Sequence, residues 1–256
     1  MQRGPRGVFI TGTDTGVGKT FVTTALVRAL VRSGMRVSVM KPVAAGAELT
    51  RDGLRNADAL ALMAAANVES GYETVNPFCF PLPASPHIAA ASAGIAVDRA
   101  VIRRRFEELA ALSDIVVVEG AGGWLAPISD TETMADIAVM LDVTMLEVVG
   151  LRLGCLSHAL LTAHGIESKG LQLAGWIANH LQPHFEHADE NIAALEKRLP
   201  APLLEVVPFP AFAAIAGAAG DSPSEASQPS LTAWAPPPPF ELSAQAVARL
   251  KAALRP

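Results

Sequence analysis

The sequence is poor in aromatic residues and has no long uncharged apolar run. Aromatic residues make up only 5% of the 256 residues, although 50% are hydrophobic and the mean hydropathy is +0.33. A membrane-spanning helix needs roughly 20 consecutive apolar residues, so we attribute the high hydropathy to a large interior rich in alanine and valine. The N-terminal stretch with Arg3 and Arg6 also lacks the apolar segment of an export signal.

Cysteine and positive charge are scarce as well. The two cysteines, Cys79 and Cys155, have neither metal-binding nor redox spacing, which favours a reducing compartment, and we expect a cytoplasmic protein. A net charge of -5 and a pI of about 5.7 argue against a nucleic-acid partner. The one basic cluster, residues 103–105, lies beside Glu107 and Glu108 and is typical of a solvated helix face.

Short apolar runs alternate with longer segments of helical period up to about residue 207. This pattern predicts an α/β fold with a mostly parallel central sheet and helices on both faces. Together with the glycine-rich loop described below, it predicts a single domain of the P-loop NTPase type. Glu147 interrupts an otherwise apolar strand, and we expect it to have a partner, to face a wet edge or to mark unusual local structure. We expect strands at residues 8–11, 37–41, 115–119, 145–149, 173–179 and 203–207, and helices at 19–33, 56–67, 98–112, 155–164 and 185–199.

The composition changes after residue 209, which gives three predicted regions. Residues 1–209 form the domain, and residues 210–240, rich in Pro, Ala and Ser, are expected to be a flexible segment. Residues 241–256 regain helical spacing, with Leu242, Val247, Leu250 and Leu254 on one side. We expect this helix to dock on the domain rather than to lie on a membrane, since it carries few cations and no aromatic anchor.

The strongest local signal is the glycine-rich stretch 12–20, Gly-Thr-Asp-Thr-Gly-Val-Gly-Lys-Thr, between a predicted strand and a predicted helix. In such a phosphate-binding loop the backbone N–H groups hold phosphate oxygens, the lysine (Lys19) reaches the β and γ phosphates, and the hydroxyl of Thr20 binds magnesium. The spacing is one residue longer than the common pattern, which points to a subgroup of P-loop proteins.

Two further pieces fall at strand ends. The apolar run 115–118 ends in Glu119 and is followed by Gly120, Ala121, Gly122 and Gly123. P-loop enzymes present an acid to the metal in this way, and glycines let the backbone approach a ligand. Lys41 ends another predicted strand, and ligands of open α/β sheets gather at the carboxyl ends of the strands.

These motifs, together with five others in the same order, resemble the dethiobiotin synthetase family over residues 8–209. The other five are Asn-Ala-Asp-Ala-Leu at 56–60, Ser-Pro-His at 85–87, Gly-Leu-Arg-Leu-Gly-Cys at 150–155, Ala-Gly-Trp-Ile-Ala-Asn at 174–179 and Pro-Ala-Pro-Leu-Leu at 200–204. The resemblance implies ATP- and Mg²⁺-dependent conversion of 7,8-diaminopelargonic acid and CO2 to dethiobiotin. The intermediates would be an N-carbamate and a carbamic-phosphoric anhydride.

The resemblance also implies roles for particular residues. Lys41 matches the family's catalytic lysine, Lys19 contacts phosphates, and Thr15 and Gly122 lie near the substrate. Mg²⁺ would be held by Thr20, Asp58 and Glu119. The nucleotide would be contacted by Gly16, Val17, Gly18, Lys19, Thr20, Asp58, Glu119, Gly120, Ala121, Gly122, Asn179, Pro208, Phe209 and Pro210, with Asn179 reading the adenine. Family members are homodimers, in which the partner's turn holds the substrate carboxylate; here that turn is Gly154, Cys155, Leu156 and Ser157.

The sequence departs from the family pattern at several positions. Ala45 stands at a substrate-side position where a serine is usual, Gly16 replaces a glutamate, and Ser157 replaces an asparagine. Around Ile215 the sequence lacks the family's acidic residue that helps to bind the nucleotide. We expect these changes to affect substrate affinity and nucleotide preference.

Two other functions stay open at this point. One is an ATPase switch of the partitioning or septum-positioning kind, although that group carries an extra lysine early in its loop, and residues 12–14 have none. The other is a family member that has lost its activity, which the changes at Gly16, Ala45 and Ser157 would suggest. His180, His184 and His187 are expected to form a surface cluster rather than a metal site, and Cys155 to be a packing residue rather than a nucleophile.

Overall fold

The computed structural model describes residues 7–209 and 240–254. Its centre is a six-stranded sheet in the order β10-β9-β8-β1-β7-β2, and every neighbouring pair is parallel. This confirms the predicted fold class, since a parallel sheet with crossover helices follows from alternating strands and helices. The strands are β1 (Gly7–Gly12), β2 (Val37–Met40), β7 (Ile115–Glu119), β8 (Thr144–Leu151), β9 (Leu173–His180) and β10 (Leu203–Val207).

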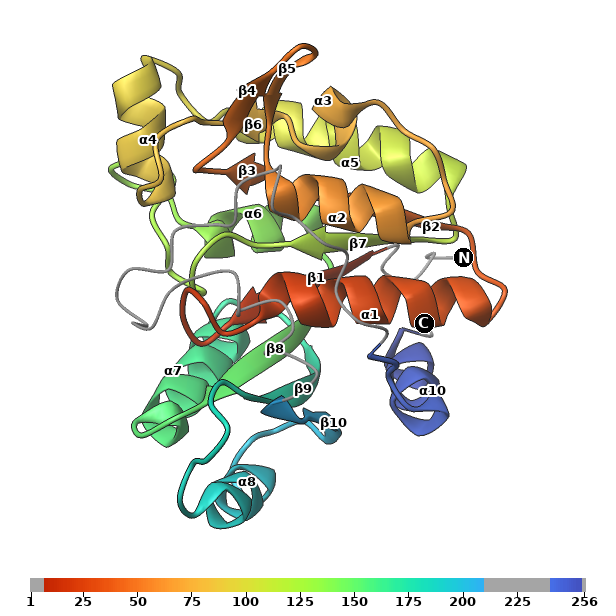
Figure 1. Ribbon diagram of the computed structural model, residues 1–256, viewed down its shortest axis with the longest axis vertical. Coiled ribbons are helices and arrows are strands. Elements are labelled where there is room, and N and C mark those ends of the chain that lie inside the picture. The colour runs from red at the N-terminus through yellow and green to blue at the C-terminus, as the bar shows by residue number, and fades with distance from the viewer. Residues whose placement is uncertain (1–6, 210–239, 255–256) are drawn as a thin grey trace.

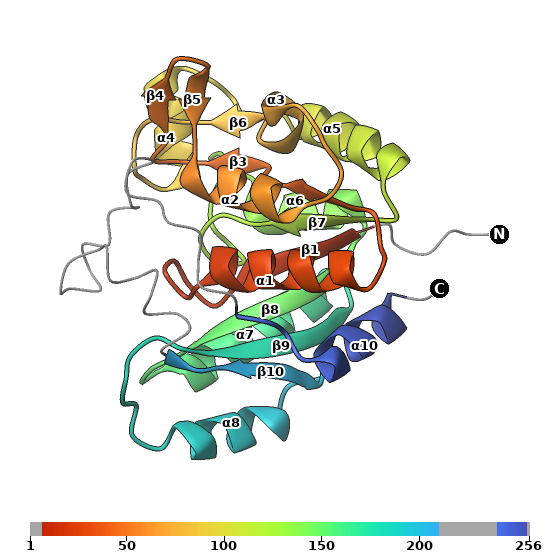
Figure 2. The same cartoon turned by 45° about the vertical axis from the view of Figure 1, so that its right-hand side comes forward.

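Helices cover both faces of this sheet (Figures 1 and 2). One face is covered by α1 (Lys19–Arg32), α2 (Ala57–Ala65) and α10 (Ala244–Ala253). The other face is covered by α5 (Arg99–Leu112), α6 (Met134–Leu141), α7 (Cys155–Ser168) and α8 (Ala188–Glu196). The sheet therefore separates two apolar cores, and all predicted strands and helices exist with boundaries shifted by a few residues. The largest shift is in α7, which continues past the predicted end at 164 and through Gly165.

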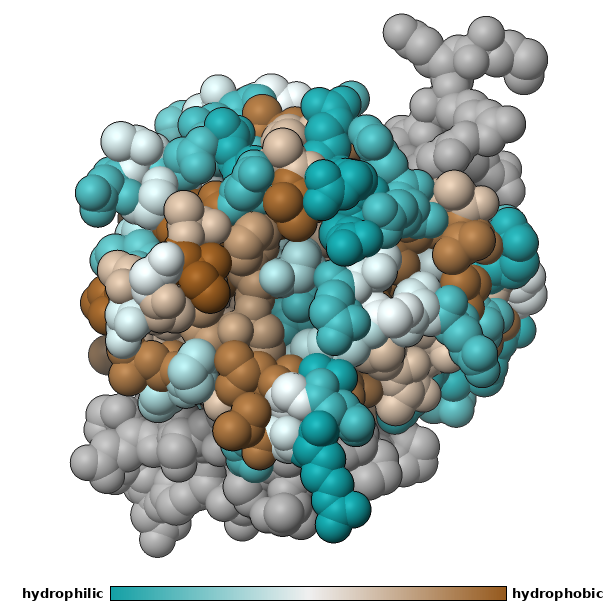
Figure 3. Space-filling model, turned by 90° about the horizontal axis from the view of Figure 1, so that it is seen from above, coloured by the Kyte–Doolittle hydropathy of each residue, from teal (hydrophilic) through white to brown (hydrophobic). Residues whose placement is uncertain are grey.

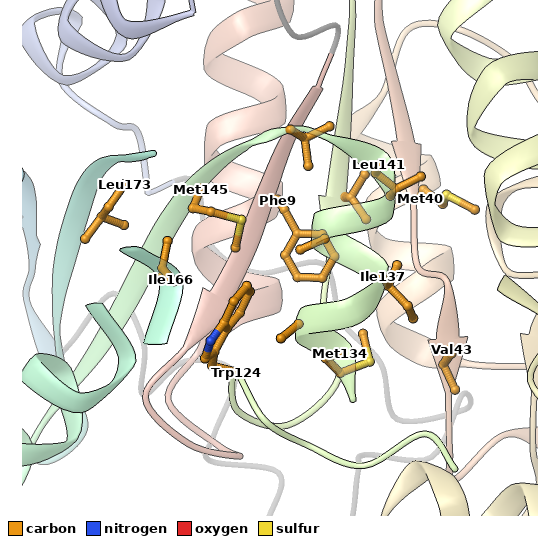
Figure 4. Close-up of a cluster of buried hydrophobic side chains, with 14 of the residues drawn as sticks. Phe9, Met40, Val43, Trp124, Met134, Ile137, Leu141, Met145, Ile166 and Leu173 are labelled. Atoms are coloured by element: carbon orange, nitrogen blue, oxygen red, sulfur yellow. The ribbon is translucent and has the colours of Figure 1, made fainter. Parts of the chain in front are cut away.

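Alternate residues of one strand contribute to different cores. Phe9 belongs to the core beneath α5, α6 and α7, whereas Val8 and Ile10 pack beneath α1. Figure 4 shows Phe9 between Met145 and Leu141, with Trp124 and Met134 below it. Because strands buried on both faces need apolar side chains at every position, the continuous apolar runs in the sequence are explained.

Several short elements were not predicted from the sequence. They are β3 (Val43–Ala44) paired with β6 (Phe78–Cys79), the antiparallel hairpin of β4 (Glu48–Thr50) and β5 (Gly53–Arg55), α3 (Tyr72–Val75), α4 (Pro86–Ala93), and α6. These elements are too short for a periodic pattern to stand out. Helix α6 does carry a capping box, in which Thr133 and Asp136 bond reciprocally, and this signal would have located its start.

Glu147 lies within β8 and is fully buried, aligned with Thr11 of β1 and Trp176 of β9. Neither of its carboxyl oxygens has a hydrogen-bond partner among the described residues. The expectation of a partner or a wet edge was therefore wrong. Strand β8 does pair irregularly with β9 between Met145 and Leu146, just before Glu147, which agrees with the expectation of unusual local structure.

Helix α10 packs its apolar side against the domain. Ala246, Val247 and Leu250 are buried in the core beneath α1, and the rings of Phe240 and Phe21 lie 5.5 Å apart. The Ser243 N–H donates to Glu205 Oε2, which anchors the start of the helix on β10. The predicted flexible segment lies outside the described residues, apart from Phe240.

At the end of the molecule that carries the β4–β5 hairpin and α4, apolar side chains reach the surface in separate areas between hydrophilic ones (Figure 3). Leu49, Ile88 and Ile95 are among the exposed apolar residues, with Leu49 81% exposed. Among the described residues, no helix has the length and apolarity required to cross a membrane.

Candidate functional site

The glycine-rich loop joins β1 to α1 at the carboxyl edge of the sheet. Gly16 and Gly18 adopt φ values of 73° and 86°, which side chains with a Cβ rarely tolerate. Gly18 directly precedes the first turn of α1, so unpaired backbone N–H groups of the helix point into the loop. Such an arrangement favours binding of an anion.

Lys19 begins α1 and turns its side chain back over the loop. Its Nζ donates to the carbonyl oxygen of Asp14 at 2.8 Å, and the residue is only 8% exposed. Burial and then the nearby charge of Lys41 lower the pKa of Lys19 from 10.5 to about 8. A lysine held in this way is ready to exchange its carbonyl contact for the negative oxygens of a phosphate.

Glu119 ends β7 directly beside the loop, and it connects three segments that are distant in sequence. Thr20 Oγ1 donates to Glu119 Oε1 at 2.8 Å, and Lys41 Nζ donates to the same oxygen at 2.6 Å. The side chain of Glu119 is completely buried. Its second oxygen, Oε2, is buried without a hydrogen-bond partner among the described residues, so one strong acceptor is left for a ligand.

Lys41 follows β2 and lies between two carboxylates. Its Nζ is 2.9 Å from Asp58 Oδ2 in the first turn of α2, in addition to the contact with Glu119. Burial opposes the charge of Lys41, but the Asp58 and Glu119 carboxylates outweigh burial and raise the pKa of Lys41. Burial likewise opposes ionisation of Asp58, and the Lys41 ammonium lowers its pKa. The two buried lysines therefore differ, because one has two carboxylates at hydrogen-bond distance and the other has none.

The loop after Glu119 lies against the phosphate-binding loop. The Gly120 N–H donates to the carbonyl oxygen of Ile10, and Gly122 has a φ of 65°. A Cβ at Gly122 would lie 3.7 Å from Thr15 Oγ1, so the predicted substrate-side residues Thr15 and Gly122 are neighbours. Ala121 lies between these two glycines, and the Gly120 carbonyl oxygen accepts a hydrogen bond from Lys41 Nζ at 3.3 Å, which connects this loop to the Lys41 side chain.

Asn179 lies near the end of β9, on the other side of the phosphate-binding loop. Its Nδ2 donates to the Val17 carbonyl oxygen at 2.8 Å, while its buried Oδ1 has no hydrogen-bond partner among the described residues. Pro208 and Phe209 follow β10, the neighbouring strand, and Pro210 lies outside the described residues. Asn179 is thus positioned to accept a hydrogen bond from a ligand at this side of the loop.

The predicted substrate turn lies at the start of α7. Gly154 is the residue before the helix, with a φ of 94°, and Cys155 is buried, while Ser157 is exposed. No hydrogen bond joins these residues to Lys41, Glu119 or Asp58 in the described part of the chain. Ala45 is linked to the helix that carries Asp58. Its carbonyl oxygen accepts a hydrogen bond from the side chain of Asn56, which directly precedes α2.

Arg152 lies within the motif at 150–155, but the sequence predicted no role for this residue. Its guanidinium forms an ion pair with the Asp14 carboxylate of the phosphate-binding loop. The two residues are separated by 138 positions, and nothing in the local sequence around Arg152 marks it as a partner of Asp14. The pairing follows from the position of β8 next to β1 in the sheet.

The residues of the cluster suit a magnesium ion bound together with phosphates. Within residues 7–209 and 240–254, no group of three or more His, Cys, Asp or Glu side chains can hold a metal by itself. Mg²⁺ in phosphate-transfer sites needs no such group, because it is held by one or two carboxylates, substrate phosphates and water. Asp58, Glu119 and the Thr20 hydroxyl carry oxygen atoms of the kind that Mg²⁺ prefers, and Glu119 Oε2 has no hydrogen-bond partner among the described residues.

Comparison with known proteins identifies close relatives. A family model described as an AAA domain matches residues 6–211. ATP-dependent dethiobiotin synthetase BioD of Aromatoleum aromaticum is 50% identical over 82% of this chain and 93% of its own length. The protein of the same name from Xanthomonas oryzae pv. oryzae is 47% identical over 80% of this chain and 92% of its own length. ATP-dependent dethiobiotin synthetase BioD 1 of Salmonella typhi is 46% identical over 86% of this chain and 92% of its own length.

Among solved structures, the cell division protein MinD of Aquifex aeolicus has a similar fold. It matches 97% of this chain and 96% of its own with a TM-score of 0.53 and 15% sequence identity. At that identity the match concerns the fold alone.

Proposed function

The chain belongs to the ATP-dependent dethiobiotin synthetase family, and on this premise we propose that it converts 7,8-diaminopelargonic acid, CO2 and ATP to dethiobiotin, ADP and phosphate. This reaction is a cyclo-ligase step of biotin biosynthesis. The observation that carries the proposal is the convergence of Lys19, Lys41 and Glu119 in one buried cluster. These residues come from three separate segments of the chain, and the cluster lies at the start of α1.

The chemistry needs positive charge at this place. An alkylamine has a pKa of roughly 10.4 and attacks CO2 only when it is neutral, so lysine cations around it favour the reactive form. The product is an anionic carbamate that must approach the γ-phosphoryl group of ATP, which is itself an anion. Lys41 stays charged between Asp58 and Glu119, and Lys19 lies on the loop, so both neutralise this approach.

Phosphorylation of the carbamate gives a mixed carbamic-phosphoric anhydride. The second amine then attacks its carbonyl carbon, phosphate leaves, and the ureido ring closes. Thr15, Gly122 and Ala45 are proposed to position the diamine, and holding both amines in place contributes most of the remaining acceleration. Ala45 offers no hydroxyl where a serine is usual, so we expect a weaker contact there.

Thr20, Asp58 and Glu119 are proposed to hold Mg²⁺ when ATP is bound. The ion would neutralise charge on the β and γ phosphates. Glu119 Oε1 is already shared between Thr20 and Lys41, which leaves Oε2 as the free acceptor of this carboxylate.

The nucleotide would lie along the phosphate-binding loop. Gly16, Val17 and Gly18 would give backbone N–H groups to the phosphates, and the loop 120–122 would lie beside them. The buried and unpartnered Oδ1 of Asn179 suits the amino group of adenine, since a buried acceptor without a donor costs free energy that such a ligand would restore. By resemblance, residues 208–210 would lie beside the base.

A second copy of the chain is proposed to complete the substrate site. The N-terminus of α7, at residues 154–157, offers helix N–H groups to a carboxylate but is not joined to the Lys41 cluster of the same chain. Leu153 and Leu161, near this helix start, are 93% and 69% exposed, and contact with a second copy would cover them. A homodimer in which each turn serves the other copy's site fits both observations.

The alternative of a membrane-associated ATPase switch has little support. The similarity to MinD concerns the fold, and the apolar side of α10 is already packed against α1 and β10. A family member without activity is also disfavoured, because Lys19, Thr20, Lys41, Asp58 and Glu119 are all present and close together.

The test is an assay of purified protein with diaminopelargonic acid, bicarbonate, Mg²⁺ and ATP. We expect dethiobiotin and ADP in equal amounts, with ADP release dependent on the diamine. ADP release without any dependence on the diamine would reject the proposed reaction, and vesicle sedimentation that depends on ATP would favour the switch instead.

A further inference from the structure

A buried polar network lies directly behind the Lys41–Asp58 ion pair. Its members are Asn56, Tyr72 and Asn76, which are 1%, 8% and 2% exposed. Asn56 is the N-cap of α2, Tyr72 begins α3, and Asn76 follows α3. Asn56 begins the motif at 56–60, but neither Tyr72 nor Asn76 belongs to a motif that pointed to the function, and Tyr72 is the single tyrosine of the chain.

The network holds the backbone of Lys41 on one side. Asn76 Nδ2 donates to the Lys41 carbonyl oxygen at 2.7 Å and to the Phe78 carbonyl oxygen at 3.2 Å. The Lys41 N–H in turn donates to the carbonyl oxygen of Val75 at 2.8 Å. Both backbone polar groups of Lys41 are therefore fixed by residues 75 and 76.

On the other side the network holds the start of the helix that carries Asp58. The backbone N–H of Asn56 donates to the Tyr72 hydroxyl at 2.7 Å, and this hydroxyl donates to Asn76 Oδ1 at 3.0 Å. The side chain of Asn56 accepts from the backbone N–H of Asp58 at 3.1 Å. A continuous chain of hydrogen bonds thus runs from the carbonyl of Lys41 to the N–H of Asp58.

The Tyr72 hydroxyl is the link that a single substitution can remove. It accepts one hydrogen bond and donates another within the network, and Cys79 Sγ lies 3.4 Å away. The Arg55 guanidinium lies 4.1 Å from the centre of the Tyr72 ring, so the ring has a packing contact of its own. Phenylalanine keeps that ring but leaves the buried N–H of Asn56 without this acceptor.

We propose that Tyr72 and Asn76 are positioning residues that fix the separation of Lys41 and Asp58, and thereby the geometry of the metal and phosphate site. The inference rests on the proposed function, because it assigns Asp58 and Lys41 to that site. If the network only stabilises the fold, its loss would lower the melting temperature without a specific effect on metal binding.

The test measures binding of Mn²⁺ by electron paramagnetic resonance, with a non-hydrolysable ATP analogue present. We expect Tyr72→Phe to weaken Mn²⁺ binding about three- to tenfold, as is typical of coupled neighbours. In an Asp58→Asn background the same substitution should change Mn²⁺ binding by less than about twofold, because the residue it positions is already altered. The matched control is Ser113→Ala, which removes a buried hydroxyl bonded to the Leu109 carbonyl oxygen at the end of α5, away from the site.

Equal effects of Tyr72→Phe in the two backgrounds, or an effect no larger than that of Ser113→Ala, would overturn the proposal. If Tyr72→Phe does not fold, Asn76→Asp serves in its place, since it removes the amide donor to Lys41 at almost constant volume. A wild-type protein that binds Mn²⁺ with this coupling but makes no dethiobiotin would reject the proposed function and leave the positioning role standing. Dethiobiotin synthesis by a protein in which Tyr72→Phe has equal effects in both backgrounds would support the proposed function and reject the positioning role.

Discussion

Glu119 and Glu147 are two buried carboxyl groups on the two strands that flank β1, and their surroundings are opposite. Both are 0% exposed, and they align with neighbouring residues of β1, Ile10 and Thr11. Alternation along the strands places them on opposite faces of the sheet. Glu119 faces α1 and receives hydrogen bonds from Thr20 and Lys41, whereas Glu147 faces the other core and has no partner among the described residues.

The difference shows that burial alone does not make a carboxylate functional. Burial raises the pKa of Glu147 well above its ordinary value, so burial favours the neutral form of this side chain. Around Glu119 the fold brings together a hydroxyl and a lysine ammonium, both from other segments of the chain. Glu119 ends its strand at the edge where loops converge, while Glu147 lies within its strand.

The largest expected effect comes from removing the cation beside Glu119. Lys41→Met leaves the buried carboxylate of Glu119 and the half-buried carboxylate of Asp58 without the Lys41 ammonium, and loss of one partner of a buried ion pair costs about 3–5 kcal/mol. We expect a loss of this size in the free energy of unfolding, measured by urea denaturation in EDTA, together with loss of turnover. Lys169→Met, which breaks the exposed pair with Asp136, is the control and should cost less than about 1 kcal/mol.

Urea denaturation of Lys41→Met in the presence of Mg²⁺ is a further test of the same charges. The ion should restore part of the stability of Lys41→Met, since it supplies positive charge to the same carboxylates. Equal stability of Lys41→Met and wild type in EDTA would show that Lys41 does not compensate these charges.

The next largest effect is a difference in turnover between variants of Glu119 and Glu147. Glu119→Gln removes the charge proposed to hold Mg²⁺, and we expect turnover to fall by about a hundredfold or more. Glu147→Gln should leave turnover within about twofold of wild type, since this side chain faces the other core and its oxygens have no hydrogen bond to a described residue. The measurement is diamine-dependent ADP release at saturating ATP and Mg²⁺, and similar losses in both variants would remove the distinction between the two acids.

The smallest effect concerns pH and Glu147 alone. In the folded protein burial raises the pKa of Glu147, so it ionises at higher pH than in the unfolded chain, where it ionises around its ordinary value of 4.5. The folded state therefore holds more protons above that pH, and wild-type stability should fall as pH rises, by at most about 1.4 kcal/mol per unit. Below the unfolded pKa both states are protonated, and this loss is absent.

Urea denaturation of wild type and Glu147→Gln between pH 4 and 8 checks this dependence. The stability of Glu147→Gln relative to wild type should increase with pH, because glutamine does not ionise. A constant difference across this range would mean that Glu147 titrates alike in the folded and unfolded states.

Much of the architecture could be predicted from short stretches of the chain. The apolar runs located the strands, the helical spacing located the main helices, and the glycine-rich stretch with Lys19 indicated a phosphate-binding loop. These signals are local, since each depends on residues that are near in sequence. Helix α4 and the β4–β5 hairpin were missed because their patterns extend over too few residues.

The resemblance to a family gave the chemistry, and it named Lys41, Asp58 and Glu119 before their contacts were known. It did not show that Lys41 lies between the two carboxylates, that Arg152 pairs with Asp14, or that Tyr72 and Asn76 connect Lys41 to α2. Each of these arrangements depends on which helix or strand lies next to which.

The sequence by itself determined the order of elements, the phosphate-binding loop and the candidate residues at the strand ends. Only the tertiary structure decided which charged groups are compensated. Lys41 and Glu119 are 78 positions apart, and Thr20 and Glu119 are 99 apart, so their contacts depend on strand order in the sheet. The physical reason is that the protonation state of a buried group is set by neighbours in space, and no local pattern encodes those neighbours.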